Sequence, residues 1–325
     1  MLRAMSKAPR FTESSIPDLA GRTILVTGAN SGIGFEAARM LAARGAHVVL
    51  ACRDASKADD ARRRIRDAHA AASVERLELD LASLKSVRAA AEAFRAGHER
   101  LDVLVNNAGV MALPFRRTAD GFEMQLGTNH LGHFALTGRL IDRLTATPGS
   151  RVVNVSSGAH HFGRIDFEHW NDESRYRRWP AYGQSKLANL LFTFELARRL
   201  DAAGSGCISV AAHPGAASTG LPMVAPAMEG KRVLTFLTRV GTPLVTQSAA
   251  QGALPTVRAA VDPEARSGDY YGPTGPLEMR GYPEKVRSSR RSRDPELAAR
   301  LWALSTDLTG VEYDALAPVP SSGAA

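Results

Sequence analysis

Residues 27–34 read Thr-Gly-Ala-Asn-Ser-Gly-Ile-Gly and decide the fold of this chain. They follow an apolar run at 23–27 that predicts a buried strand, and they open a segment at 33–44 whose apolar spacing predicts a helix. The glycines permit a tight turn and a close approach of the backbone to phosphate, and the helix start offers unpaired N–H groups and a partial positive charge. A strand, a glycine loop and a helix in this order predict a dinucleotide site. We assign to it Gly28, Asn30, Ser31, Gly32, Ile33 and Gly34.

The same alternation of strand and helix continues along the chain. Apolar runs predict further strands at 47–51, 74–79, 101–105, 151–155, 207–213 and 269–271. Helical patterns occupy 55–70, 84–96, 118–145 and 181–203. Continuous Val, Ile and Leu runs are typical of strands covered on both faces, and intervening helices make such strands parallel. The sequence therefore predicts an α/β fold, a doubly wound parallel sheet or Rossmann fold, in a single domain.

The chain shows no internal repeat and no composition break, which indicates one domain. We expect an N-terminal extension at 1–18, the single domain at 19–314 and a disordered Pro- and Ser-containing tail at 315–325. Two long connections interrupt the regular pattern, at 160–180 and 215–247. Long loops in compact domains are often functional. The second loop contains an apolar helix-like piece, which we interpret either as packing against the domain or as a lid over an apolar substrate pocket.

The charge balance alone is compatible with nucleic-acid binding. The formal net charge is +8, from 41 basic and 33 acidic residues in 325. The basic residues are scattered, however, and the cluster at 62–66 lies beside acidic residues in a helix-like segment, which is typical of a solvated face. We therefore expect no nucleic-acid partner.

Metal, disulfide and membrane functions have little support in the sequence. Cys52 and Cys207 are too few for a disulfide framework or a four-ligand zinc site, and His160, His161 and His169 lack an acid–histidine ligand spacing. We expect no metal. No apolar run reaches the ~18 residues of a membrane span, and no secretory signal stands at the start of the sequence. These features predict a cytoplasmic protein.

Several motifs in order resemble the short-chain dehydrogenase/reductase family. The glycine loop has the family's Gly-x-x-x-Gly-x-Gly spacing, and Asn106-Asn107-Ala108-Gly109 closes the fourth predicted strand as in that family. Tyr182-Gly-Gln-Ser-Lys186 matches its Tyr-x-x-x-Lys signature, and Ser157 lies 25 residues before the tyrosine. His213-Pro214-Gly215 matches the turn after the sixth strand. The resemblance covers residues 19–275 and implies an enzyme that acts on CH–OH or C=O groups with a nicotinamide cofactor.

The resemblance also implies four catalytic residues. Tyr182 and Lys186 stand four apart on a predicted helix and so share one face; we expect the ammonium, with an oxidised nicotinamide, to lower the pKa of the phenol. Tyr182 would then be the general acid in carbonyl reduction, and Lys186 would also bind the nicotinamide ribose. Ser157 would donate to the substrate oxygen, and adjacent Ser156 would face the other way. Asn129 matches the family residue that holds a water of the proton relay.

The end of the second strand favours NADP(H) over NAD(H). The family's NAD-selecting carboxylate falls at Cys52, which is neutral, and Arg53 follows it and can pair with a 2′-phosphate. Lys57 could assist, whereas Asp54 could cap the following helix.

Further cofactor contacts follow from matching family positions. Asp80 and Leu81 would hold the adenine, and Thr219, next to Ser218, would touch the carboxamide. The remaining residues implied along the ribose and nicotinamide path are Asn107, Ala108 and Gly109.

Four segments resemble one branch of the family, the retinol dehydrogenase-like branch: residues 52–54, 129–134, 155–160 and 185–189. This branch is similar to WW-domain oxidoreductase and protochlorophyllide reductase. That branch implies an apolar alcohol, aldehyde or ketone, retinal-like or otherwise. Two alternatives remain open: a non-catalytic NADP(H)-binding redox sensor or interaction protein, and pigment photoreduction. Family members often pair through the helices matching 118–145 and 181–203, so a homodimer or homotetramer is expected.

Overall fold

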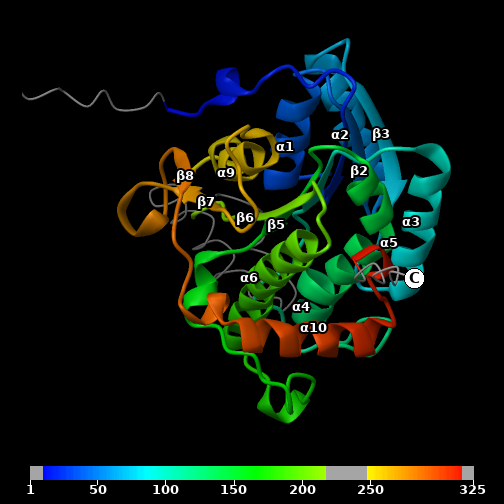
Figure 1. Ribbon diagram of the computed structural model, residues 1–325. Coiled ribbons are helices and arrows are strands. Elements are labelled where there is room, and N and C mark those ends of the chain that lie inside the picture. Colours follow the sequence, from blue (N-terminus) through cyan, green and yellow to red (C-terminus); the bar gives the residue numbers. More distant parts are fainter. Residues whose placement is uncertain (1–9, 217–246, 317–325) are drawn as a thin grey trace, which may run out of the picture.

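An eight-stranded sheet forms the middle layer of the computed structural model, which describes residues 10–216 and 247–316 (Figure 1). Its strands follow the order β3-β2-β1-β4-β5-β6-β7-β8, and every neighbouring pair is parallel except β7 and β8. The bounds are β1 (Thr23–Thr27), β2 (His47–Cys52), β3 (Ser73–Glu78), β4 (Val103–Asn106), β5 (Arg151–Val155), β6 (Ile208–Ala212), β7 (Tyr270–Pro273) and β8 (Pro283–Lys285). The predicted doubly wound α/β fold is confirmed.

Helices cover both faces of this sheet (Figure 1). One face packs against α1 (Gly32–Ala42), α2 (Ala55–Ala68) and α9 (Ala249–Val261). The other packs against α3 (Leu84–Gly97), α5 (Gly132–Ala146) and α6 (Arg178–Ala202). The short α4 (Met124–Leu126) precedes α5, and α10 (Pro295–Thr309) lies across α6.

Burial on both sheet faces explains the unbroken apolar runs. In β1, Ile24 and Val26 belong to the core beneath α1 and α9, whereas Leu25 belongs to the core beneath α3 and α5. All three side chains are fully buried. A strand between two helical layers has no solvent-facing side, so its residues do not alternate with polar ones.

The structure contains further elements that were not predicted from the sequence. The strand predicted at 269–271 is β7, but it is not the last strand, because β8 pairs antiparallel with it at the sheet edge. Helix α9 contains Pro255 and Gly252, both of which weigh against a helix by local propensity. Helix α10 has recognisable signals, with Asp294 at the N-cap and Gly310 in the left-handed region at its end.

The predicted boundary segments are partly ordered. Glu13, in the extension at 1–18, accepts two hydrogen bonds from Arg39 of α1, and Ile16 is buried. At the other end a short helical turn at Asp314–Leu316 reaches into the tail predicted at 315–325. Nearly all of the predicted lid at 215–247 lies outside the described residues.

The sheet order reverses between β1 and β4, because the chain proceeds from β1 toward β3 on one side and from β4 toward β7 on the other. Ligands of open α/β sheets bind at the carboxyl ends of the strands beside such a switch point. Within the described ranges, no helix has both the length and the apolar character that a membrane crossing requires.

Candidate active site

A groove with a cavity volume of about 470 Å³ opens at the carboxyl ends of the central strands. It brings together every residue predicted to contact the cofactor except Thr219, which lies outside the described residues. The predicted residues in its lining are Gly28, Asn30, Ser31, Gly32, Ile33, Gly34, Arg53, Asp80, Leu81, Asn107, Ala108, Gly109, Tyr182 and Lys186.

The glycine loop has the close contacts that only glycine allows. Gly28 and Gly32 have φ values of +66° and +57°, in the left-handed region. A Cβ at Gly34 would lie 2.4 Å from both the Gly28 carbonyl oxygen and Asn107 Nδ2. The loop is therefore held tightly beneath α1, and its open side forms a cradle of the kind that receives a pyrophosphate.

The hydroxyl of Thr27 links the two cofactor motifs. Its Oγ1 accepts hydrogen bonds from the backbone N–H groups of Asn107 and Ala108, both at 2.9 Å. The same oxygen lies 2.9 Å from Nε2 of buried His133, whose Nδ1 lies 2.9 Å from the Asn129 carbonyl. Burial lowers the pKa of His133 to about 4, so the ring is neutral and connects β1 to the segment that carries Asn129. His133 was not among the predicted site residues, although its i+4 spacing from Asn129 was an available signal.

The end of β2 presents a free arginine to the groove. Cys52 is buried, and burial raises the pKa of its thiol to about 11. Asp54 caps α2, as predicted, by accepting from the Lys57 backbone N–H at 3.1 Å, and its bond to Ser56 holds its pKa at about 2. Arg53 is exposed and has no ion-pair partner in the described part of the chain. Its guanidinium is thus available to an anionic ligand.

Tyr182 and Lys186 line the groove, and Ser157 lies beside Tyr182 without lining the groove itself. Tyr182 and Lys186 share one face of α6, and Lys186 Nζ lies 5.9 Å from the centroid of the Tyr182 ring. The Ser157 hydroxyl forms a hydrogen bond with the Tyr182 phenol. By contrast, Ser156 donates to the Lys186 carbonyl at 2.8 Å, so the two serines serve different partners.

Burial dominates the electrostatics of this group. It raises the pKa of Tyr182, opposed by the hydrogen bond from Ser157. It also lowers the pKa of Lys186 to about 8, although Nζ donates to the Val155 carbonyl at 3.1 Å. The downward shift that we expected at Tyr182 is therefore not produced by the protein's own groups, because desolvation of the phenolate outweighs the contribution of Ser157.

Asn129 lies behind the groove, in the π-helical turn Gly127–Leu131. Its side chain accepts from the Val110 N–H at 2.8 Å, and donates to the Val110 carbonyl and to Ser185 Oγ, both at 2.9 Å. A Cβ at Gly109 would lie 3.1 Å from Asn129 Oδ1 and 3.5 Å from Lys186 Nζ. Asn129 thus fixes the backbone just beyond the predicted nicotinamide path.

A second cavity of about 410 Å³ adjoins Ser157. Leu277 and Met279 line it, and Leu277 is 90% exposed. The same cavity also has a polar side. Nε2 of His213 lies 2.8 Å from a Glu278 carboxylate oxygen, and this contact lowers the pKa of that carboxyl. No motif in the sequence signals residues 277–279. Only the tertiary fold brings these residues next to Ser157.

One aromatic of the long loop also faces this region. Trp179 is 55% exposed, and its ring meets that of Tyr182 edge-on, with centroids 6.2 Å apart. The loop at 160–180 is anchored by Tyr176, which donates to the Leu113 carbonyl at 2.7 Å and accepts from Gln125.

Parts of α6 proposed for subunit pairing are covered within the chain. Ala188 packs in one cluster with Ala298 and Leu301 of α10. A Cβ at Gly183 would lie 2.7 Å from the Phe162 ring. Pairing through these parts of α6 would therefore require α10 and Phe162 to move, and the oligomeric state stays a prediction.

Known proteins share both the sequence and the architecture. The family model described as short chain dehydrogenase matches residues 22–230. Human retinol dehydrogenase 12 is 43% identical over 298 residues, covering 91% of this chain and 89% of that protein. Human retinol dehydrogenase 13 is 43% identical over 315 residues, covering 95% and 90% respectively.

Two solved structures extend the comparison. A crystal structure of an uncharacterized protein from Mycobacterium paratuberculosis is 45% identical, with a TM-score of 0.76 over 94% of this chain and 99% of the other. A structure from Beutenbergia cavernae, described as an NAD(P)-dependent gluconate 5-dehydrogenase with bound NADP, is 28% identical. Its TM-score is 0.57, over 75% of this chain and 91% of the other.

Proposed function

Since this chain belongs to the short chain dehydrogenase family, in its retinol dehydrogenase-like branch, we propose that it is an NADP(H)-dependent reductase or dehydrogenase for apolar carbonyl or alcohol substrates. The observation that carries the proposal is the placement of Tyr182 and buried Lys186 in the lining of the cofactor-shaped groove, with Ser157 beside the Tyr182 phenol. The groove residues fit a dinucleotide, because the glycine cradle, Arg53 and the 107–109 backbone lie along one path.

Each catalytic side chain has a role that its surroundings support. The nicotinamide, when bound, supplies or accepts the hydride. Tyr182 donates the proton to the carbonyl oxygen, and its raised pKa keeps the phenol protonated before the reaction. Ser157 donates a hydrogen bond to the same oxygen. Lys186 binds the ribose hydroxyls and supplies positive charge. Asn129 holds the Val110 backbone behind them, and it is also our candidate for holding the relay water.

An apolar substrate is supported by the walls around this group. Trp179, Leu277 and Met279 present apolar surface near Tyr182 or Ser157. The names of the curated relatives, retinol dehydrogenases, agree with an apolar alcohol or aldehyde. The His213 and Glu278 pair gives one wall a polar character, which would suit the polar end of an otherwise apolar molecule.

A cofactor and substrate panel tests the proposed function. We expect the purified protein to oxidise NADPH faster than NADH with hydrophobic aldehydes and ketones, including retinal. Apolar walls bury such substrates, whereas small polar carbonyls gain little from them. The measurement is the initial rate of loss of absorbance of the reduced cofactor. Turnover restricted to small polar carbonyls would refute the apolar substrate class, and tight NADPH binding without any turnover would favour a redox sensor.

Arg53→Ala tests the cofactor preference. The exposed guanidinium has no partner among the described residues, so a 2′-phosphate would give it one. Losing that charge-assisted contact raises KM for NADPH by roughly 10–100-fold and leaves KM for NADH nearly unchanged. Arg63→Ala is the matched control, because Arg63 is an exposed arginine of α2 paired with Asp60. Equal losses with both cofactors would show that Arg53 does not read the 2′-phosphate.

A further inference from the structure

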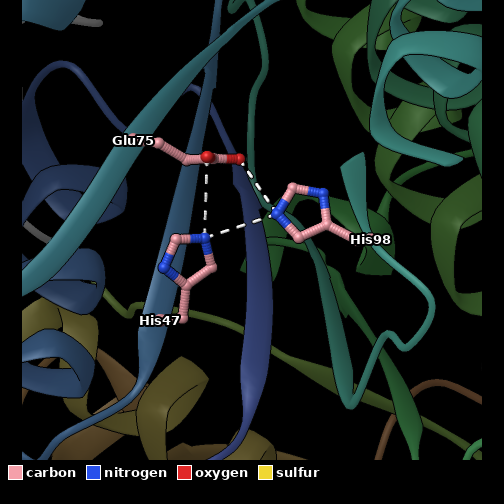
Figure 2. A group of neighbouring side chains, drawn as sticks. All are labelled: His47, Glu75 and His98. Carbon is pink, nitrogen blue, oxygen red and sulfur yellow. Dashed lines mark hydrogen bonds and ion pairs between the residues drawn. The ribbon is translucent and has the colours of Figure 1, made fainter. Parts of the chain in front are cut away.

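Three ligand-type side chains converge at the amino-terminal end of the sheet edge, away from the groove (Figure 2). His47 is the first residue of β2, Glu75 lies in the edge strand β3, and His98 directly follows α3. The two imidazole Nε2 atoms are 3.4 Å apart. The carboxylate of Glu75 lies 3.1 Å from His98 Nε2 and 3.7 Å from His47 Nε2.

These separations match the ligand shell of a small tetrahedral cation. Zn²⁺ bonds to histidine nitrogen and carboxylate oxygen at about 2.0–2.1 Å, so two ligand atoms of a tetrahedron lie about 3.3–3.4 Å apart. The three observed separations range from 3.1 to 3.7 Å, with Glu75 Oε1 facing His98 and Glu75 Oε2 facing His47, so either carboxylate oxygen can serve as the ligand atom. Two histidines and one carboxylate are also a known zinc ligand set that leaves a fourth position for water.

Hydrogen bonds at the Nδ1 atoms of both histidines orient their Nε2 atoms toward the space between the three side chains. Nδ1 of His98 lies 3.1 Å from the Phe94 carbonyl, which can only accept, so this nitrogen carries a proton. Nε2 of His98 faces the Glu75 carboxylate, and a positive charge between these two atoms, from a metal cation or from a proton, makes their contact favourable. Nδ1 of His47 lies 2.7 Å from Ser73 Oγ. Such partners on the far nitrogen are typical of metal-binding histidines.

We propose that His47, Glu75 and His98 bind one divalent transition-metal ion, Zn²⁺ in the first place, with water as the fourth ligand. The three side chains are partly exposed, so an ion can enter from solvent. The ion would join the start of β2 to the edge strand and to the end of α3. Because β2 rises about 3.3 Å per residue, the site lies about 17 Å along the strand from Cys52, and it acts on stability rather than on hydride transfer.

The test uses the full-length protein without a histidine tag, with Zn²⁺ or Co²⁺ as the only added ligand. We expect calorimetry to give one Zn²⁺ per chain and Co²⁺ to show the intense visible absorption of a four-coordinate ion. Zn²⁺ at about 100 times its Kd is expected to raise Tm by roughly 5 °C. Weak, octahedral-type Co²⁺ absorption or no stoichiometric binding would overturn the proposal and leave a proton-bridged His–Glu cluster.

Two variants separate the site from adventitious binding. Glu75→Gln and His98→Ala are each expected to weaken Zn²⁺ binding by more than roughly 100-fold and to abolish the Tm increase. The conservative Glu75→Gln change keeps the side-chain shape, so its circular dichroism verifies folding. His169→Ala is the control, since His169 is a partly exposed histidine whose carboxylate partner, Asp166, lies 3.6 Å away. Binding that survives both site variants, or that His169→Ala also removes, refutes the site whatever the catalytic assays show.

Discussion

We expect Tyr182→Phe to lower kcat for carbonyl reduction by roughly 10³-fold, with little change in the Kd for NADPH. The phenol is the proton donor in the proposed reaction, and it lines the groove with Ser157 beside it. Phenylalanine keeps the ring, which is 93% buried, but removes the acidic proton. The Ser157 hydroxyl retains a contact with the Ala159 N–H at 3.3 Å, so the local fold should persist. Stopped-flow and steady-state NADPH oxidation measure kcat, and fluorescence titration measures Kd.

Tyr176→Phe is the matched control for that experiment. Tyr176 is another partly buried phenol, but its hydroxyl bonds to the Leu113 carbonyl and to Gln125 and does not line the groove. Its removal should change kcat by only a small part of the Tyr182→Phe effect. If Tyr182→Phe retained more than a tenth of the activity, another group would have to supply the proton.

Lys186→Met is expected to give a more stable but inactive protein. Lys186 is fully buried, and burial alone lowers its pKa to about 8. Its charged form is therefore unfavourable in the folded state at pH 7, by up to about 3 kcal/mol. Methionine has a similar length and no charge, and the Val155 carbonyl still accepts from Asn189 at 3.0 Å. We expect the free energy of unfolding to rise by about 1–3 kcal/mol and kcat to fall at least ~100-fold.

The pH dependence gives this prediction a specific sign. The folded pKa of Lys186, about 8, lies below its unfolded value of 10.5. Between these values the unfolded chain binds the extra proton, so this lysine makes the wild type more stable as pH rises. The stability advantage of Lys186→Met should thus be full below pH 8 and disappear toward pH 10.5. Urea unfolding at pH 7, 9 and 10 measures it.

Lys285→Met serves as the control for this second experiment. Lys285 is 39% exposed and pairs with Asp269 at 2.7 Å. Its ammonium is not buried, so replacing it removes no desolvation penalty. We expect no gain in stability there. A loss of stability in Lys186→Met at pH 7 would show that the bond from Nζ to Val155 outweighs the desolvation of the ammonium.

Local sequence determined the parts of the molecule that depend on near neighbours. The glycine loop at 28–34 could be predicted because left-handed backbone and a missing Cβ are properties of single residues. The shared face of Tyr182 and Lys186 follows from helical spacing. The central strands could be predicted because burial on both faces leaves an unbroken apolar run. These signals were enough for the fold and for the residues that line the groove.

Tertiary structure alone decided the features that join distant segments. Leu277 reaches the cavity beside Ser157 because β8 pairs back onto β7, a contact that no local pattern predicts. The pKa of Tyr182 rises because packing removes water, which the i,i+4 spacing does not reveal. His47, Glu75 and His98 come together because β2 and β3 pair in a parallel register and because α3 ends beside the start of these strands. Residues so far apart in the chain gain a common site only when the sheet and its helices have assembled.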